Sequence, residues 1–211
     1  MYHLQYQSWR TADLAREQAL RPVLDQLETG ENGAVVVINP LGQVRREYAT
    51  VKLPADSIEG MTLHDGEKTV PWEQIRREAE LVIMGFVTDV PPLGYRVYKL
   101  VPGEVPTEAA NVVQGLNIST DHYAVQFLAN GGIESFVPAG DDRSVVMGGS
   151  LCIAGDVGGE TVRSAGELHI AQTGPVSVVI EEEGRLGATH SYTIRYRIVA
   201  GVPYMLTELD I

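Results

Sequence analysis

The fold is decided by a stretch near the start of the chain, which consists of Ala34-Val35-Val36-Val37-Ile38-Asn39-Pro40-Leu41-Gly42. Its first five residues are uncharged and mostly β-branched, so they predict a strand that is buried on both faces. Proline has no backbone donor and restricts the residue before it, so Asn39-Pro40 predicts the end of that strand and a turn.

A second stretch has the same form and consists of Asp89-Val90-Pro91-Pro92-Leu93-Gly94-Tyr95-Arg96-Val97-Tyr98. The two prolines cannot join a central ladder, and Gly94 permits a reversal of the chain. Tyr95 to Leu100 then alternates as a strand. Together the two stretches predict two β-hairpins or crossovers.

The amino-acid sequences of these two stretches resemble those of the α-mannosidases of glycoside hydrolase family 38. In that family the corresponding segments lie in a small β-domain that follows the catalytic domain and helical bundle. A third stretch, Tyr123–Phe136, looks like the start of the large β-sandwich of the same enzymes. The resemblance runs from about Ala34 to the C-terminus, and the residues before it fit the end of the bundle. It implies a mainly β fold: an N-terminal helix, a small antiparallel β-sandwich, and part of a large, galactose-mutarotase-like β-sandwich.

The expected domain organisation follows from this resemblance and from the composition of the segments. We expect a helical segment at 1–32, a small β-sandwich domain at 33–101, a linker at 102–115 that is rich in Pro and Ala, and the N-terminal part of the large sandwich at 116–211. The last residues still alternate as a strand. We therefore expect a segment of a longer protein; the alternative is a small protein that has lost its catalytic portion.

One amphipathic helix is predicted at Thr11–Thr29, with Thr11 as its cap and Gly30 after its end. Its apolar side chains recur at helical spacing, which makes one stripe of the helix a candidate interface. The stripe consists of Leu14, Ala15, Ala19, Leu20, Val23, Leu24 and Leu27.

The rest of the chain predicts antiparallel strands separated by Gly and Pro turns. One segment stays open: Glu73–Glu80 is charged enough to form a surface helical turn instead of a strand. The expected strands are Val44–Leu53, Met61–His64, Lys68–Trp72, Leu81–Val87, Asp121–Leu128, Gly132–Val137, Val145–Ile153, Val176–Glu181, Thr189–Val199 and Tyr204–Ile211.

Composition excludes some partners and indicates a compartment. The chain of 211 residues is 44% hydrophobic and 21% charged, as is ordinary for a globular protein. A formal net charge of −12 argues against nucleic acid and acidic membrane surfaces, because phosphates would be repelled. No signal peptide or membrane span is visible, so we expect a cytoplasmic protein. The single cysteine, Cys152, excludes an internal disulfide and is expected to be a buried strand residue.

The resemblance implies zinc-dependent, retaining hydrolysis of α-mannosides by the parent enzyme, with a zinc site of two His and two Asp, an aspartate nucleophile and a carboxylic acid catalyst. Those motifs belong to the family's N-terminal region. We therefore assign no catalytic, metal-binding or cofactor-binding residue here, and substrate-binding residues stay unknown. The histidines offer no ligand spacing for a metal; they are His3, His64, His122, His169 and His190.

Acidic clusters, glycine-rich stretches and aromatic side chains are alternative candidate sites. Glu181-Glu182-Glu183 precedes Gly184 and predicts a solvated hairpin tip, and Asp141-Asp142-Arg143 predicts a turn. Gly155–Gly159 is not followed by a helix pattern, so it predicts a hairpin turn and not a phosphate cradle. Aromatic side chains could stack on sugar rings, although packing within the sheets is favoured for each. The candidates are Trp72, Tyr95, Tyr98, Tyr192 and Tyr204.

The sequence thus predicts a non-catalytic β-domain segment of an α-mannosidase-like glycoside hydrolase, inactive by itself. Its expected partners are the catalytic and helical remainder of the parent enzyme, with carbohydrate as a further candidate. The alternatives are a stand-alone carbohydrate-binding module and a structural module in which the helix stripe and sheet faces contact other chains.

Overall fold

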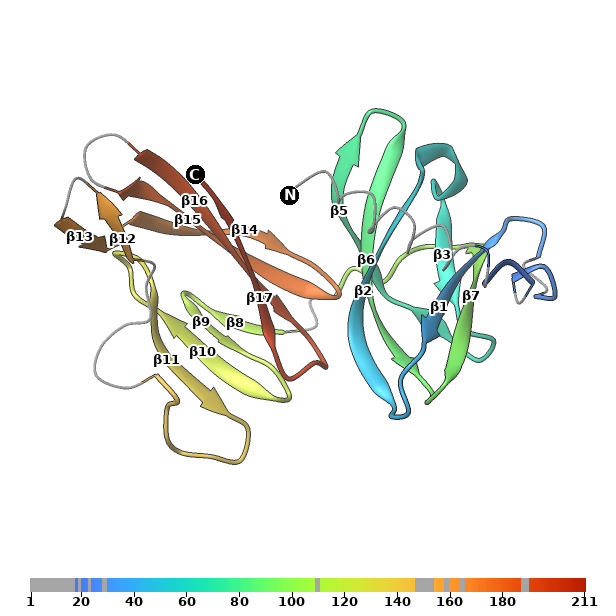
Figure 1. The fold of residues 1–211 in the computed structure, drawn as a ribbon, viewed down its shortest axis with the longest axis horizontal. Coiled ribbons are helices and arrows are strands. Elements are labelled where there is room, and N and C mark those ends of the chain that lie inside the picture. The colour runs from blue at the N-terminus through green and yellow to red at the C-terminus, as the bar shows by residue number, and fades with distance from the viewer. Residues whose placement is uncertain are drawn as a thin grey trace, which may run out of the picture.

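The computed structural model shows two β-sandwiches side by side, connected by one segment after strand β7 (Figure 1). It describes residues 18, 20–22, 24–27, 30–108, 111–146, 154–157, 160–163, 166–186 and 190–211. The mainly β fold class is confirmed: the described strands form antiparallel sheets of three or four strands, plus one two-stranded hairpin.

The first sandwich, called here the small domain, packs a four-stranded sheet of order β1-β7-β3-β4 on a three-stranded sheet of order β2-β6-β5. Its strands are β1 (Ala34–Asn39), β2 (Arg45–Pro54), β3 (Met61–His64), β4 (Thr69–Val70), β5 (Trp72–Glu78), β6 (Leu81–Val90) and β7 (Gly94–Pro102), with a 3-10 turn at Ala55–Ser57. Buried side chains from both sheets form one core, which includes Leu63, Val82, Met84, Phe86 and Tyr98.

In the small domain one expectation was wrong, and the segment that the sequence left open is a strand. Strand β1 is not buried on both faces: it is an edge strand of its sheet, and Val36, Val37 and Ile38 are only half-buried. The segment Glu73–Glu80 is not a helical turn, because β5 extends through Glu78 and pairs with β6. Of its charged side chains, Arg76 and Arg77 face solvent and Glu78 is half-buried, whereas Glu73 is buried and needs partners within the protein.

The turn after Asn39 and the turn after Val90 lie together at one end of the small domain. The N–H of Leu93 donates to the carbonyl of Leu41 at 2.8 Å. The buried amide of Asn39 donates to the carbonyl oxygens of Gln43 at 2.7 Å and Pro91 at 3.0 Å, so one side chain fastens both turns. The Asn39-Pro40 signal therefore fixes a pair of loops and not only a strand end.

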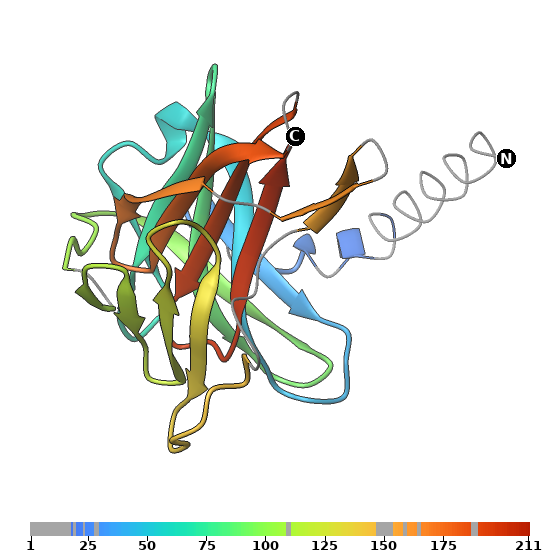
Figure 2. The same ribbon diagram turned by 90° about the vertical axis from the view of Figure 1, so that its left-hand side faces the viewer.

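The second sandwich, called here the large-sandwich segment, packs a sheet of order β11-β10-β9-β8 on a sheet of order β14-β15-β16-β17 (Figure 2). Strand β8 lies within the 102–115 segment that the sequence favoured as a linker, and it pairs with β9. The strands are β8 (Val112–Gln114), β9 (Asn117–Ser119), β10 (Tyr123–Phe127), β11 (Ile133–Pro138), β12 (Ala154–Val157), β13 (Glu160–Arg163), β14 (Gly166–Thr173), β15 (Ser177–Leu186), β16 (His190–Val199) and β17 (Met205–Asp210).

Inward-facing side chains of both sheets fill the core of the large-sandwich segment, which includes Ile118, Tyr123, Val125, Ile180, Ile194 and Ile198. The expected hairpin tip at Glu181–Glu183 was wrong, since these residues lie inside β15. The expected turn at 141–143 is present: the Asp141 carboxylate accepts the N–H groups of Asp142 and Arg143. Gly155–Val157, expected within a hairpin turn, lie in strand β12, which pairs with β13; Gly158 and Gly159 lie outside the described residues.

Only part of the predicted helix can be compared with the structure. Residues 18, 20–22 and 24 are helical, and Gly30 has a positive φ of 75° after them. Thr11 and most of the apolar stripe, His3 and Cys152 lie outside the described residues. Among the described helical residues, none belongs to a helix long and apolar enough to cross a membrane.

Candidate functional site: the interface between the two sandwiches

A tyrosine crosses the three-stranded sheet of the small domain to reach a glutamate on the far strand. Tyr48 lies on β2 and Glu73 on β5, while Gly85 lies between them on the central strand β6. A Cβ built on Gly85 would lie 2.0 Å from the Tyr48 hydroxyl oxygen, so only glycine lets the ring pass. The hydroxyl donates a hydrogen bond of 2.8 Å to Oε1 of Glu73.

Glu73 is also held by the large-sandwich segment. Its carboxylate accepts the backbone N–H of Ser177 at 3.1 Å, the Ser177 hydroxyl at 2.6 Å and Nη1 of Arg197 at 2.7 Å. The Glu73 side chain is 2% exposed and that of Arg197 13% exposed, so the ion pair is buried. Since both carboxylate oxygens carry hydrogen bonds within the protein, Glu73 serves as a clamp and not as a free acid or base.

The surroundings of Tyr48 match this role. Burial of the phenol, with the negative charge of Glu73 beside it, raises the pKa of Tyr48 far above its usual range. The Arg197 guanidinium carbon lies 5.8 Å from the centre of the Tyr48 ring, within reach of a cation–π interaction. Tyr48 therefore stays protonated, and its hydroxyl donates a hydrogen bond to the Glu73 carboxylate.

A second set of contacts lies beside the clamp. The Tyr204 hydroxyl donates to Glu47 Oε2 at 2.9 Å and accepts the Tyr48 N–H at 3.0 Å. Val176, Val199 and Val202 are buried under Tyr48, Val87 and Tyr204. The interface thus combines an apolar centre with hydrogen-bonded charges, as stable domain interfaces do.

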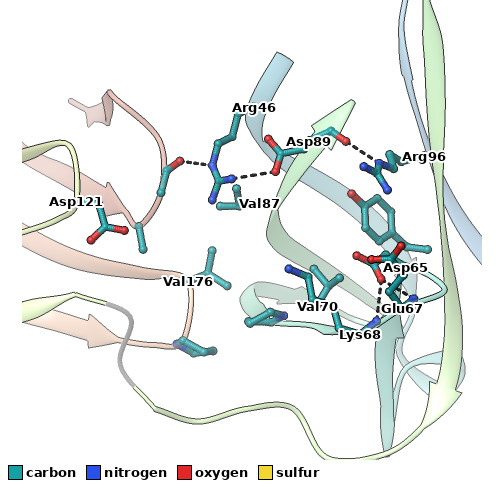
Figure 3. A pocket seen from close by; sticks show the side chains of 15 residues that line it. Arg46, Asp65, Glu67, Lys68, Val70, Val87, Asp89, Arg96, Asp121 and Val176 are labelled. Atoms are coloured by element: carbon teal, nitrogen blue, oxygen red, sulfur yellow. Dashed lines mark hydrogen bonds and ion pairs between the residues drawn. The ribbon is translucent and has the colours of Figure 1, made fainter. Parts of the chain in front are cut away.

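Arg46 bridges the sandwiches at the edge of the interface. Its Nε donates to the carbonyl of Gly201, and its Nη1 lies 2.9 Å from Asp89 Oδ2 (Figure 3). Gly201 has a positive φ of 73°, and a Cβ there would lie 2.6 Å from the Arg46 guanidinium. The positive φ favours glycine at this turn, and a side chain there would displace the Arg46 guanidinium.

A cleft of about 450 Å³ opens beside Arg46 between the two sandwiches (Figure 3). Its walls carry charged side chains over an apolar base. The charged residues are Arg46, Asp65, Glu67, Lys68, Asp89, Arg96 and Asp121, and the apolar ones include Val70, Pro71, Val87, Pro175 and Val176. Hydrogen bonds from backbone N–H groups, that of Lys68 above all, lower the pKa of Asp65.

The large-sandwich segment buries a second carboxylate, that of Glu182, which is 0% exposed. It accepts the Gly132 N–H at 2.9 Å and the hydroxyls of Tyr192 at 2.7 Å and Tyr196 at 3.1 Å. Strand alternation turns Glu182 inward while Glu183 stays exposed. This carboxylate ties the Gly131-Gly132 turn to the opposite sheet.

The aromatic candidates for sugar stacking are spread over the fold. Tyr98 and Tyr192 are buried, Trp72 and Tyr204 are half-buried, and Tyr95 is 45% exposed. The indole N–H of Trp72 is buried without a hydrogen-bond partner among the described residues, at the edge of a shallow hollow of about 510 Å³. The structure therefore brings together no row of exposed rings from these five candidates.

The described residues contain no group of three or more His, Cys, Asp or Glu side chains that could hold a metal ion. His169 lies 3.7 Å from Glu181, which is a surface pair and not a ligand set. Among the described residues there is therefore no counterpart of the site of two His and two Asp that the resemblance assigns to the catalytic region of the parent enzyme.

Sequence reasoning missed the interface residues Glu73, Ser177 and Arg197. One signal was present: Gly85 interrupts a run of large apolar residues in β6, and a lone glycine in a strand marks a close approach of another group. No local pattern indicates that Glu73 would find its partners more than a hundred residues later.

No protein-family model matches the chain, and no curated protein does. Among solved structures, the chain is similar to the crystal structure at 2.55 Å of a protein in glycosyl hydrolase family 38 from Enterococcus faecalis. The TM-score is 0.62 at 13% sequence identity, over 92% of this chain and 33% of that one.

At this identity the likeness concerns the fold alone. The described chain has a β-rich fold like that of part of this glycosyl hydrolase family 38 protein. It spans about a third of that protein's length.

Proposed function

We propose that the chain is the non-catalytic, β-rich segment of an α-mannosidase-like enzyme of glycoside hydrolase family 38. In this proposal the parent enzyme hydrolyses α-mannosides with retention and uses zinc held by its catalytic region. The partners of the chain are the catalytic and helical remainder of that enzyme.

The fold likeness over 92% of the chain is the observation that carries the proposal. The sequence stretches at Ala34–Gly42 and Asp89–Tyr98 support it, since their resemblance to family 38 concerns the same region. A retaining glycosidase needs two carboxyl groups about 5 Å apart that face a sugar. The two buried carboxylates of the described residues, Glu73 and Glu182, instead accept hydrogen bonds from side chains and backbone on all sides.

The interface contacts give the segment a mechanical role in this proposal. A buried ion pair, three buried valines and the Arg46 bridge hold the two sandwiches in one arrangement. A scaffold of this kind positions other parts of an enzyme without touching the substrate.

The proposal is tested by the coding sequence around this segment and by an activity measurement. We expect an upstream region with the zinc-binding and carboxylate motifs of the family, and no release of aryl alcohol from an aryl α-mannoside by the purified chain with added zinc. A reading frame limited to this chain, or hydrolysis by the chain alone, would contradict it.

A further inference from the structure

The cleft between the two sandwiches has the size of a small-molecule site, since such sites occupy about 300–1,000 Å³ and favour domain interfaces. Its volume is about 450 Å³. The small domain contributes the β3–β4 turn and parts of β2, β6 and β7. The large-sandwich segment contributes Asp121, the turn before β15 and the turn after β16. Figure 3 shows Asp121 facing the Asp65–Lys68 turn across the cleft.

The charges in the cleft nearly balance, with three cationic and four acidic side chains. Some are already engaged: Arg46 with Asp89, and Arg96 Nε with the carbonyl of Asp89 at 2.9 Å. Among the described residues, Lys68, Glu67 and Asp121 form no ion pair within 4.0 Å. The small-domain wall therefore offers a donor, Lys68, and an acceptor, Glu67, and the opposite wall offers an acceptor, Asp121.

Between these walls lies an apolar floor lined by Val70, Val87 and Val176 (Figure 3); Val87 is half-buried, while Val70 and Val176 are nearly buried, at 7% and 3% exposed. A ligand that fits must present hydroxyl groups to the walls and C–H groups to the valines. An anion would meet the acids of the cleft, and a cation would meet its bases. A neutral saccharide satisfies both walls, because each hydroxyl donates to a carboxylate and accepts from an ammonium or guanidinium group.

We infer that the cleft between the sandwiches binds a neutral saccharide, held between Lys68 and Asp121 over the valines. The chemistry of the cleft carries this inference; the choice of a mannoside as the first probe rests on the proposed function. With no exposed aromatic ring among the described lining residues, the affinity is weak, with a Kd on the order of 1 mM.

The test is a titration followed by amide chemical shifts of the isotope-labelled chain. The probes are methyl α-mannopyranoside, methyl α-glucopyranoside and methyl α-galactopyranoside, with inorganic phosphate and choline as charged probes. We expect at least one glycoside to shift amides near Lys68, Asp121 and Val176, and neither charged probe to do so. Shifts elsewhere, shifts only with a charged probe, or none with any glycoside would overturn the inference.

Exposed side chains allow substitutions that keep the fold. Lys68→Ala and Asp121→Asn should each weaken glycoside binding roughly tenfold, as expected for a lost charge-assisted hydrogen bond. Lys99→Ala and Asp142→Asn are matched controls, exposed and outside the cleft, and should leave the affinity unchanged. An equal effect of all four would contradict a site in the cleft. The titration measures binding to this chain and does not depend on the activity of a parent enzyme. An absence of glycoside binding would therefore contradict the site in the cleft without contradicting the proposed function.

Discussion

Gly85 lies directly under the ring of Tyr48, and a Cβ at this position would come within 2.0 Å of the phenolic oxygen and 2.4 Å of Cζ. The absence of a side chain on one strand thus decides where the side chain of the neighbouring strand can go. The position of Tyr48 in turn lets its hydroxyl bind Glu73, whose carboxylate contacts the second sandwich.

We therefore expect Gly85→Ala to displace Tyr48 and to lower the free energy of unfolding by about 1–3 kcal/mol, as overpacking does. Urea unfolding measures it. Gly42→Ala is the control, because a Cβ there meets nothing within 4 Å. In a Tyr48→Ala background the cost of Gly85→Ala should shrink; an unchanged cost would place the clash elsewhere.

Removal of the Glu73 carboxylate should lower the free energy of unfolding by more than Gly85→Ala does. Glu73→Ala leaves Arg197, 13% exposed, buried without its partner, which costs about 3–5 kcal/mol. Glu80→Ala, on an exposed residue near the end of the same hairpin, should change stability little. The double variant Glu73→Ala/Arg197→Ala should lose less stability than the two single variants lose in sum. If its loss of unfolding free energy equals that sum, Glu73 and Arg197 are not coupled.

Alkaline pH should weaken the folded chain through Tyr48. Its folded pKa lies above that of an unfolded tyrosine, about 10, because burial and Glu73 disfavour the phenolate. The stability that this shift provides is fully present below about pH 10 and is lost as pH rises toward the folded pKa. The Tyr48→Phe variant should lose less stability per pH unit above about pH 10 than the parent chain. Equal slopes would show that another group controls the alkaline transition.

Glu182 offers a test within one sandwich. Glu182→Gln replaces an acceptor by an amide whose donors face the Gly132 N–H or a tyrosine hydroxyl, so we expect a loss of about 1–3 kcal/mol. The neighbouring Glu183→Gln, on an exposed side chain, is the matched control. Equal stability of the two variants would mean that the buried site can rearrange around an amide.

Sequence alone indicated the β class and many of the strands, because alternating apolar residues and Gly or Pro turns are local signals. The strand at Ala34–Ile38 and the turn at Asn39-Pro40 are examples. The same local logic failed at Glu181–Glu183, where acidic residues suggested a solvated hairpin tip. It left Glu73–Glu80 open between a strand and a surface helical turn, and the structure has a strand there through Glu78.

The wrong expectation at Glu182 and the missed burial of Glu73 have one physical cause. A carboxylate is buried only where hydrogen-bond donors from distant parts of the chain meet it. For Glu73 these donors are Ser177 and Arg197, and for Glu182 they include Tyr192 and Gly132. The interface, and the cleft beside it, therefore could not be predicted without knowing which strands become neighbours.

The distance along the chain between Glu73 and Arg197 also bears on synthesis at the ribosome. The small domain emerges first and can complete its own core, yet its clamp carboxylate then stands in water with only Tyr48 beside it. Arg197 follows 124 residues later. The docking of the two halves is therefore a late event that seals an already folded surface, and until then that surface is open to other chains.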